Sequence, residues 1–139
     1  FSGLKTPGSL EPFTNLEIEH ILPNKPEADL HAKWATENPG KVYDDYKNRL
    51  GNLTLLEKPI NIVAGNDFYA AKQVEYSKSG NYLTRSLVAL TDVGQNTSIS
   101  RINTKLTAFP AWNAASIEKR HALLITLAQE VWKTTAIDV

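Results

Sequence analysis

Two short stretches decide how this chain folds: LEIEHILP at residues 16–23 and GNLTLL at residues 51–56. In the first, apolar and acidic residues alternate from Leu16 to Ile21, as in a short β-strand, and Pro23 ends the strand because proline cannot extend the ladder. In the second, a Gly-Asn pair precedes an apolar run that also suits a strand. The two stretches therefore predict a small β-hairpin.

The rest of the chain favours helices. We expect a helical segment with Pro59 in its first turn, and further helices at residues 27–37, 42–49, 67–79, 82–90 and 114–135. Residues 94–98 are polar and loop-like. Trp34, Trp112 and Trp132 fall in or near helical segments, which favours packing in the core over stacking on bases. The predicted fold class is mainly α with a small β-hairpin.

The length of 139 residues suits one compact domain, and the hydrophobic content of 42% is enough for one core. Residues 1–15 are rich in glycine and proline and read as a linker or irregular lead-in, so the predicted domain is 16–139. The chain begins at Phe1 and contains no methionine. We therefore expect it to be a fragment of a longer protein.

Composition excludes several classes of protein. Cysteine is absent, which excludes disulfides and zinc sites built on thiolates. No apolar run approaches the roughly 20 residues of a membrane helix, and no secretion signal is visible. The 15 basic and 15 acidic residues balance, which argues mildly against a dedicated DNA-binding domain. A nuclease module that a neighbouring domain holds on its substrate escapes that objection.

Four residues form a constellation that suits phosphodiester hydrolysis. Glu19 and His20 end the first strand, Asn52 opens the second, and Asn61 follows in the next helical segment. Imidazole titrates near neutral pH, so His20 can act as a general base. Glu19 and Asn61 offer oxygen ligands of the kind that Mg²⁺ prefers. Alternation places Glu19 and His20 on opposite faces, so they share a cavity only if the strand ends or bends before Pro23.

These motifs resemble a known nuclease family. EHILP at residues 19–23, GNLTLL at residues 51–56 and Asn61 are similar to the ββα-metal core of the HNH (His-Me finger) fold, also found in RNA-guided CRISPR nucleases. The nearest resemblance is to the C-terminal nuclease domain of GmrSD-type restriction enzymes and SspE-like phage-defence proteins. It covers about residues 16–132 and continues in Asn66, Phe68, Lys72, Tyr76, Ser77, Trp112, Ile117, Arg120 and Trp132.

The resemblance implies a role for each site residue. His20 would be the general base, and Asn52 would orient its ring and pin the ββα loop. Glu19 would be a metal ligand, where the wider group more often has Asp. Asn61 would be the second ligand, where many relatives carry His. The implied cofactor is Mg²⁺, with Mn²⁺ as a substitute.

The resemblance also implies a biological role. The chain would be a metal-dependent DNA endonuclease or nickase, the effector of a restriction or anti-phage defence protein in the bacterial cytoplasm. Its partners would be DNA and an N-terminal, NTPase-like sensing domain of the same polypeptide, with no membrane involved. One metal site in a monomer favours nicking of one strand.

Several residues are candidates for contact with nucleic acid: Arg49, Lys58, Lys72 and Asn66. Arg49 and Lys58 flank the predicted site and could form a local basic patch. The competing interpretation for Arg49 and Lys58 is an ordinary solvated surface, and for Lys72 it is pairing with an acidic neighbour. Arg120 lies in the longest predicted helix, where we expect a structural role.

Simpler interpretations exist for each motif taken alone. A Glu-His pair at a strand end is usually solvated, Gly-Asn pairs are usually turns, and Asn61 could be a helix cap. Two other functions also stay open. One is an RNA-directed nuclease of the same fold, and the other is a catalytically silent module that binds nucleic acid or docks a partner domain.

Overall fold

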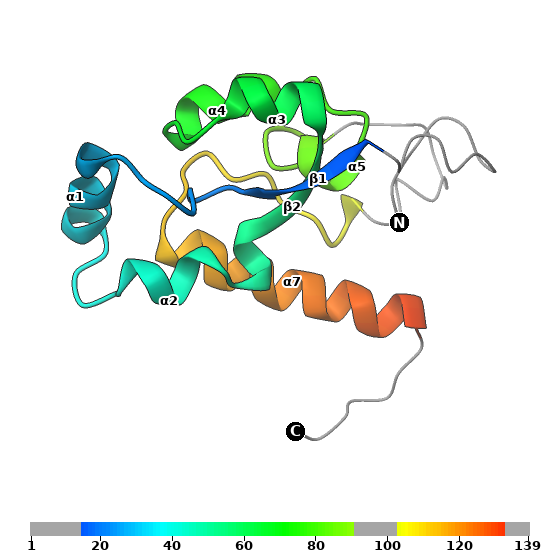
Figure 1. Ribbon diagram of the computed structural model, residues 1–139. Coiled ribbons are helices and arrows are strands. Elements are labelled where there is room, and N and C mark those ends of the chain that lie inside the picture. The colour runs from blue at the N-terminus through cyan, green and yellow to red at the C-terminus, as the bar shows by residue number, and fades with distance from the viewer. Residues whose placement is uncertain (1–14, 91–102, 133–139) are drawn as a thin grey trace.

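The computed structural model describes residues 15–90 and 103–132. Outside these ranges lie residues 1–14 of the predicted lead-in, the predicted loop at residues 94–98, and residues 133–135 of the last predicted helix. The described part is mainly helical with one small antiparallel sheet, which confirms the predicted fold class (Figure 1). No helix within the two ranges has both the length and the hydrophobicity that crossing a membrane requires.

The sheet consists of β1 (Leu16–His20) and β2 (Leu53–Glu57). The helices are α1 (Ala28–Glu37), α2 (Tyr43–Lys47), α3 (Lys58–Ala64), α4 (Tyr69–Tyr76), α5 (Tyr82–Arg85) and α7 (Ala114–Trp132), and a single 3-10 turn, η2 (Leu50–Asn52), leads into β2. No tight turn joins the strands, because α1, α2 and η2 lie between them in the chain. The pairing is nevertheless regular, with His20 opposite Leu53 and Leu16 opposite Glu57.

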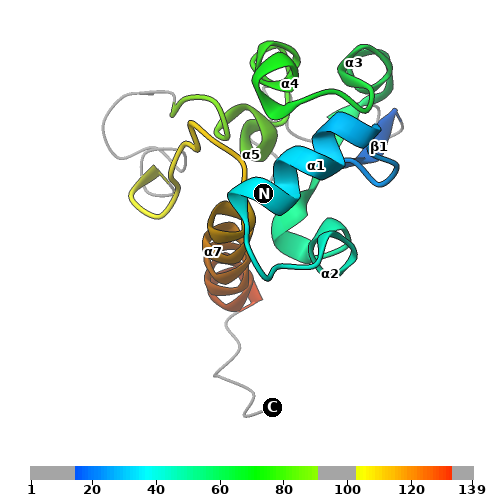
Figure 2. The same ribbon diagram turned by 90° about the vertical axis from the view of Figure 1, so that its left-hand side faces the viewer.

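The strands lie between two groups of helices. In Figure 1, α3 and α4 are on one side of the sheet, and α2 and α7 are on the other. Figure 2 shows the same division from the end of the molecule, with α1 at the front. α3 begins directly where β2 ends, with Pro59 in its first turn, where the missing N–H costs no helical hydrogen bond. The order β1, β2, α3 thus puts a helix against the sheet.

The helices α1, α2, α4 and α5 are all shorter than predicted, α4 and α5 by the most. α5 ends at Arg85 rather than continuing to residue 90. The carbonyl of Leu87 accepts hydrogen bonds from the Phe109 backbone N–H and the Tyr69 hydroxyl, at 2.9 and 3.2 Å. That carbonyl is therefore engaged in tertiary contacts. α4 begins at Tyr69 rather than residue 67 and ends at Tyr76 rather than residue 79, and Phe68 is its N-cap, with extended backbone.

Aromatic side chains dominate the core. Trp34 and Trp112 are buried, as expected, but Trp132 at the end of α7 is 73% exposed, so the prediction for it was wrong. Trp34 lies within 5.6 Å of Tyr43 and 5.2 Å of Tyr46, measured between ring centroids, which joins α1 to α2. The principal buried apolar residues are Ile21, Leu22, Leu30, Trp34, Tyr43, Tyr46, Leu56, Tyr76, Leu87, Phe109, Trp112 and Ile117.

Gly51 is needed because α7 comes very close to η2. A Cβ atom at this position would lie 2.2 Å from the carbonyl oxygen of Ile117 and 2.8 Å from the backbone nitrogen of His121. Among the described glycines, only Gly40 and Gly65 have positive φ, so the Gly51-Asn52 pair is not the positive-φ turn that such pairs usually form. The missing side chain lets the helix and the strand entrance touch.

Candidate active site

The two faces of β1 point toward different elements. Alternation along the strand places Glu17 and Glu19 on one face, and their side chains reach α3 and α4. His20 lies on the other face and reaches the end of α2. β1 ends at His20, and a bend follows. The imidazole and the carboxylate are thus neighbours in the chain, but the two side chains have separate hydrogen-bond partners.

The His20 ring is partly exposed and is held by Asn48. Its Nε2 lies 3.2 Å from Oδ1 of Asn48, the exposed C-cap residue of α2. Because a carbonyl oxygen can only accept, this contact selects, for the neutral ring, the tautomer in which Nε2–H donates and Nδ1 carries the lone pair. No hydrogen bond to Nδ1 occurs within the described ranges. Nδ1 is therefore the ring atom that can take a proton.

Glu19 is anchored on the inner face of β1, the face that meets α3 and α4. Its side chain is buried, and Oε1 accepts hydrogen bonds from Lys72 Nζ at 2.6 Å and from the Tyr76 hydroxyl at 2.7 Å. Lys72 Nζ also donates to the carbonyl oxygen of His20 at 2.8 Å. In the described part of the chain, Oε2 of Glu19 has no hydrogen-bond partner. The Glu19 carboxylate is therefore buried, and the simpler interpretation of a solvated Glu-His pair is wrong for it.

Burial shapes the ionisation of both groups that hold Glu19. It lowers the pKa of Lys72, and the negative charge of Glu19 opposes that shift. Burial also raises the pKa of Tyr76 far above its usual range, and the carboxylate of Glu19 adds to the increase. Tyr76 therefore keeps its proton at neutral pH and remains a donor to Glu19.

Asn61 contacts the same face of β1 as Glu19. Its Nδ2 donates to Oε2 of Glu17 at 3.0 Å, and the other oxygen of Glu17 lies 3.9 Å from Lys58 Nζ. Because Asn61 donates through its nitrogen, Oδ1 stays free of hydrogen bonds from described residues. Asn61 lies inside α3 and not at its N-cap, which is Glu57, so the helix-cap interpretation is wrong.

The donor set fits a hard cation that keeps several waters. Glu19 Oε2 and Asn61 Oδ1 are carboxylate and amide oxygens without partners among the described residues, and such oxygens suit Mg²⁺. No group of three or more His, Cys, Asp or Glu side chains that could bind a metal occurs within residues 15–90 and 103–132. A cation here would therefore depend on Glu19, Asn61, water and substrate oxygens.

Asn52 makes no hydrogen bond with the His20 ring, so the prediction that it orients the ring by such a bond is wrong. Asn52 is fully buried, and its amide ties three segments together. Oδ1 accepts from the Leu22 backbone N–H at 2.7 Å and from Trp112 Nε1 at 2.9 Å. Nδ2 donates to the carbonyl oxygens of Leu22 and Lys47 at 2.9 and 2.7 Å. These four bonds use the full capacity of the amide and pin the loop after β1.

Of the two interpretations of Lys72, pairing with an acidic neighbour is confirmed and contact with nucleic acid is wrong, because its side chain is 1% exposed and is engaged by Glu19 and by the His20 carbonyl oxygen. Arg49 is partly exposed next to Asn48, with its guanidinium 4.0 Å from the centre of the Tyr46 ring. Lys58 is exposed at the start of α3. Both stay candidates for phosphate contact.

Asn66 is exposed but lies in acidic surroundings. It lines a shallow cavity together with Glu27, Asp29 and Asp67. Three carboxylates nearby would repel a phosphate, so the surroundings of Asn66 favour nucleic acid less than those of Arg49 and Lys58.

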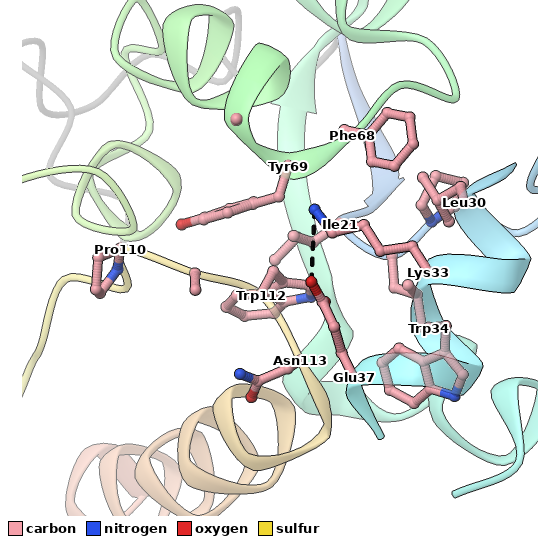
Figure 3. Close-up of a pocket in the computed structure, with 14 residues that line it drawn as sticks. Ile21, Leu30, Lys33, Trp34, Glu37, Phe68, Tyr69, Pro110, Trp112 and Asn113 are labelled. Carbon is pink, nitrogen blue, oxygen red and sulfur yellow. Dashed lines mark ion pairs between the residues drawn. The ribbon is translucent and has the colours of Figure 1, made fainter. Parts of the chain in front are cut away.

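A cavity of about 430 Å³ lies behind the loop that follows His20, between α1, the start of α4 and residues 110–113. Figure 3 shows Tyr69 beside Trp112, and their ring centroids are 5.3 Å apart. The Lys33 and Glu37 side chains at its rim form an ion pair of 3.7 Å. Neither His20 nor any expected metal ligand lines this cavity, so it is separate from the candidate site.

The sequence did not reveal the roles of three residues at the site. Asn48 holds the ring of His20, Glu17 holds Asn61, and Tyr76 holds Glu19. Glu17 shares the strand face of Glu19, and this alternation was a usable signal. Tyr76 lies four residues after Lys72 on one helix face, but nothing local indicates its partner.

The site thus joins a small antiparallel sheet, the helix that follows it, and an imidazole and a carboxylate at the end of the first strand. The sequence-family model for the C-terminal domain of GmrSD restriction endonucleases matches residues 4–127. The chain belongs to this family, and its function is thus related to restriction endonucleases. Neither the curated proteins nor the solved structures contain a significant match to it.

Proposed function

We propose that this chain is a metal-dependent DNA endonuclease domain of the HNH type that nicks one strand at a time. The ββα core would be β1, β2 and α3. The observation that carries the proposal is that consecutive residues of β1 present an imidazole and a carboxylate, each with one acceptor atom free of described partners, Nδ1 of His20 and Oε2 of Glu19.

The chemistry follows from those two atoms. His20 Nδ1 accepts a proton from the attacking water while Asn48 holds the opposite ring nitrogen. Glu19 and Asn61 would hold Mg²⁺ or Mn²⁺, which when bound stabilises the charge that develops on the phosphate and the leaving oxygen. Asn52 acts as scaffold, because its amide fixes the loop after His20 and makes no hydrogen bond with the ring.

The family also suggests the biological setting. Its members are the C-terminal domains of restriction endonucleases, which supports DNA as the substrate and an N-terminal sensing domain as the partner in the longer protein. We propose a role in restriction or antiviral defence in the bacterial cytoplasm. The balanced charge of the chain fits an effector that another domain delivers to DNA.

Conversion of supercoiled plasmid tests this function. Purified wild type is incubated with Mg²⁺, Mn²⁺ or EDTA, and open-circular and linear products are quantified over time, with structured RNA as a parallel substrate. We expect open circles to accumulate first with either metal, and no product with EDTA or with His20→Ala. Cleavage of RNA but not DNA would show an RNA nuclease. If neither substrate is cleaved at any protein concentration, the domain is a silent module.

A further inference from the structure

We propose that Lys72 and Tyr76 of α4 are positioning residues that fix the Glu19 carboxylate and the end of β1 for metal binding. This inference rests on the proposed function, because it takes Glu19 as a metal ligand. It assigns a role to two buried side chains, neither of which touches substrate.

The geometry joins both side chains to one oxygen atom. Lys72 and Tyr76 are four residues apart on α4 and therefore share a helix face. Lys72 Nζ and the Tyr76 hydroxyl both donate to Oε1 of Glu19, at 2.6 and 2.7 Å. Two donors at one oxygen leave little freedom for the carboxylate to rotate. Oε2 is then the oxygen that remains for a cation.

Lys72 connects the carboxylate to the base as well. Its Nζ also donates to the His20 carbonyl oxygen at 2.8 Å, so one ammonium group holds the Glu19 side chain and the His20 backbone. The next residue, Ile21, donates its backbone N–H to the carbonyl oxygen of Asn52 at 3.0 Å. The end of β1 is thus fixed on both sides of the His20 peptide. This is the arrangement expected of groups that orient metal ligands from outside the coordination shell.

Stability alone is a poor explanation for this cluster. Lys72 is 1% exposed and Tyr76 is fully buried, and removing charges from water is expensive even when they are paired. Hydrophobic side chains of similar volume often stabilise such sites equally well or better. An ion pair in the core is therefore better explained by what it does for Glu19 than by its contribution to folding.

Tyr69 provides a matched control on the same helix. Its hydroxyl donates to the carbonyl oxygens of Phe109 and Leu87, at 2.7 and 3.2 Å, and makes no described contact with Glu19. Tyr69→Phe and Tyr76→Phe each remove one inward-pointing hydroxyl from α4 without leaving a large cavity. A purely structural role would make the two variants alike in metal binding.

The test is calorimetric titration of MnCl₂ into the DNA-free domain, for wild type, Tyr76→Phe, Tyr69→Phe and Glu19→Gln. We expect Tyr76→Phe to raise the Kd for Mn²⁺ by about tenfold or more, as substitution of such outer groups does, and Tyr69→Phe to leave it within about twofold. The Mn²⁺ concentration for half-maximal plasmid nicking should rise in parallel. Lys72→Gln provides a second variant with the same expected direction.

The outcomes separate this inference from the proposed function. If wild type nicks DNA through His20 but Tyr76→Phe and Tyr69→Phe bind Mn²⁺ equally well, the positioning role is wrong and the function stands. If Glu19→Gln binds Mn²⁺ as wild type does, Glu19 is not a ligand and the inference is also wrong. If wild type neither binds Mn²⁺ nor nicks DNA, both proposals are overturned.

Discussion

The inner face of β1, which meets α3 and α4, holds its side chains more tightly than the outer face, which meets the end of α2. On the inner face, Glu19 is 5% exposed and receives two short hydrogen bonds from buried donors on α4. On the outer face, His20 is partly exposed, and its one described side-chain hydrogen bond, of 3.2 Å, is to the exposed Asn48. One strand therefore carries an anchored side chain beside one that water can reach.

This difference matches the two tasks that hydrolysis requires. A metal ligand gains from rigidity, because the geometry of the cation depends on it. A general base must be reachable by water and must keep one nitrogen unengaged. The described contacts of Glu19 and His20 follow this division, and substitutions on either face should reveal it.

The largest expected effect is on the inner face. Lys72→Met leaves Glu19 buried without its cation, so we expect the free energy of unfolding to fall by about 3–5 kcal/mol in urea titrations. Lys58→Met, at an exposed cation on α3, is the control and should change it by less than about 0.5 kcal/mol. Adding Glu19→Leu to Lys72→Met should recover much of the loss. Equal stability of the two lysine variants would remove the distinction between buried and exposed charge.

The next largest effect is expected at Gly51, where η2 meets α7. Gly51→Ala places a Cβ against the Ile117 carbonyl, so α7 must shift, and we expect a loss of about 1–3 kcal/mol or more. Leu50→Ala at the neighbouring exposed position is the control. Thermal unfolding of both variants measures the difference. A Gly51→Ala protein as stable as wild type would show that α7 does not press on η2.

A smaller effect is expected at the ring of His20. Asn48→Ala removes a partly exposed hydrogen bond worth about 1 kcal/mol, so the nicking rate should fall about fivefold and the free energy of unfolding by no more than about 1 kcal/mol. Asn66→Ala serves as the control and should leave the rate unchanged. A rate for Asn48→Ala equal to wild type would mean that Asn48 does not orient the ring.

The smallest effect concerns an exposed carboxylate. The hydrogen bond from Tyr46, and then that from Lys41, lower the pKa of Glu118 below its usual 4.5. A lowered folded-state pKa stabilises the protein above the unfolded value, and this contribution is lost as pH falls through the folded value. The stability difference between wild type and Glu118→Gln should therefore be largest above pH 4.5 and shrink below it. A difference that grows on acidification would contradict this sign.

Local patterns were enough to predict part of this structure. Alternation located β1, the Gly-Asn pair located the entrance of β2, and Pro59 marked the start of α3. The pattern also warned that Glu19 and His20 would point to opposite faces, as they do. These features depend on neighbouring residues, which the sequence displays directly.

Partners across the fold could not be predicted in the same way. The sequence could not show which carboxylate pairs with Lys72, because Glu19 lies 53 positions earlier in the chain. Asn52 was expected at the His20 ring, but Leu22 and Trp112 from distant segments use its amide. The need for Gly51 arises from the approach of α7. Each of these depends on packing between elements, which no local pattern encodes.

The most direct test of the central claim compares two histidines under single-turnover conditions. Nicking rates of supercoiled DNA with saturating Mn²⁺ are measured for wild type, His20→Ala and His31→Ala, the last at an exposed position of α1. We predict a loss of about 100-fold or more for His20→Ala, as expected for a general base, and a rate within about twofold of wild type for His31→Ala. A His20→Ala protein that nicks as fast as wild type would contradict the account.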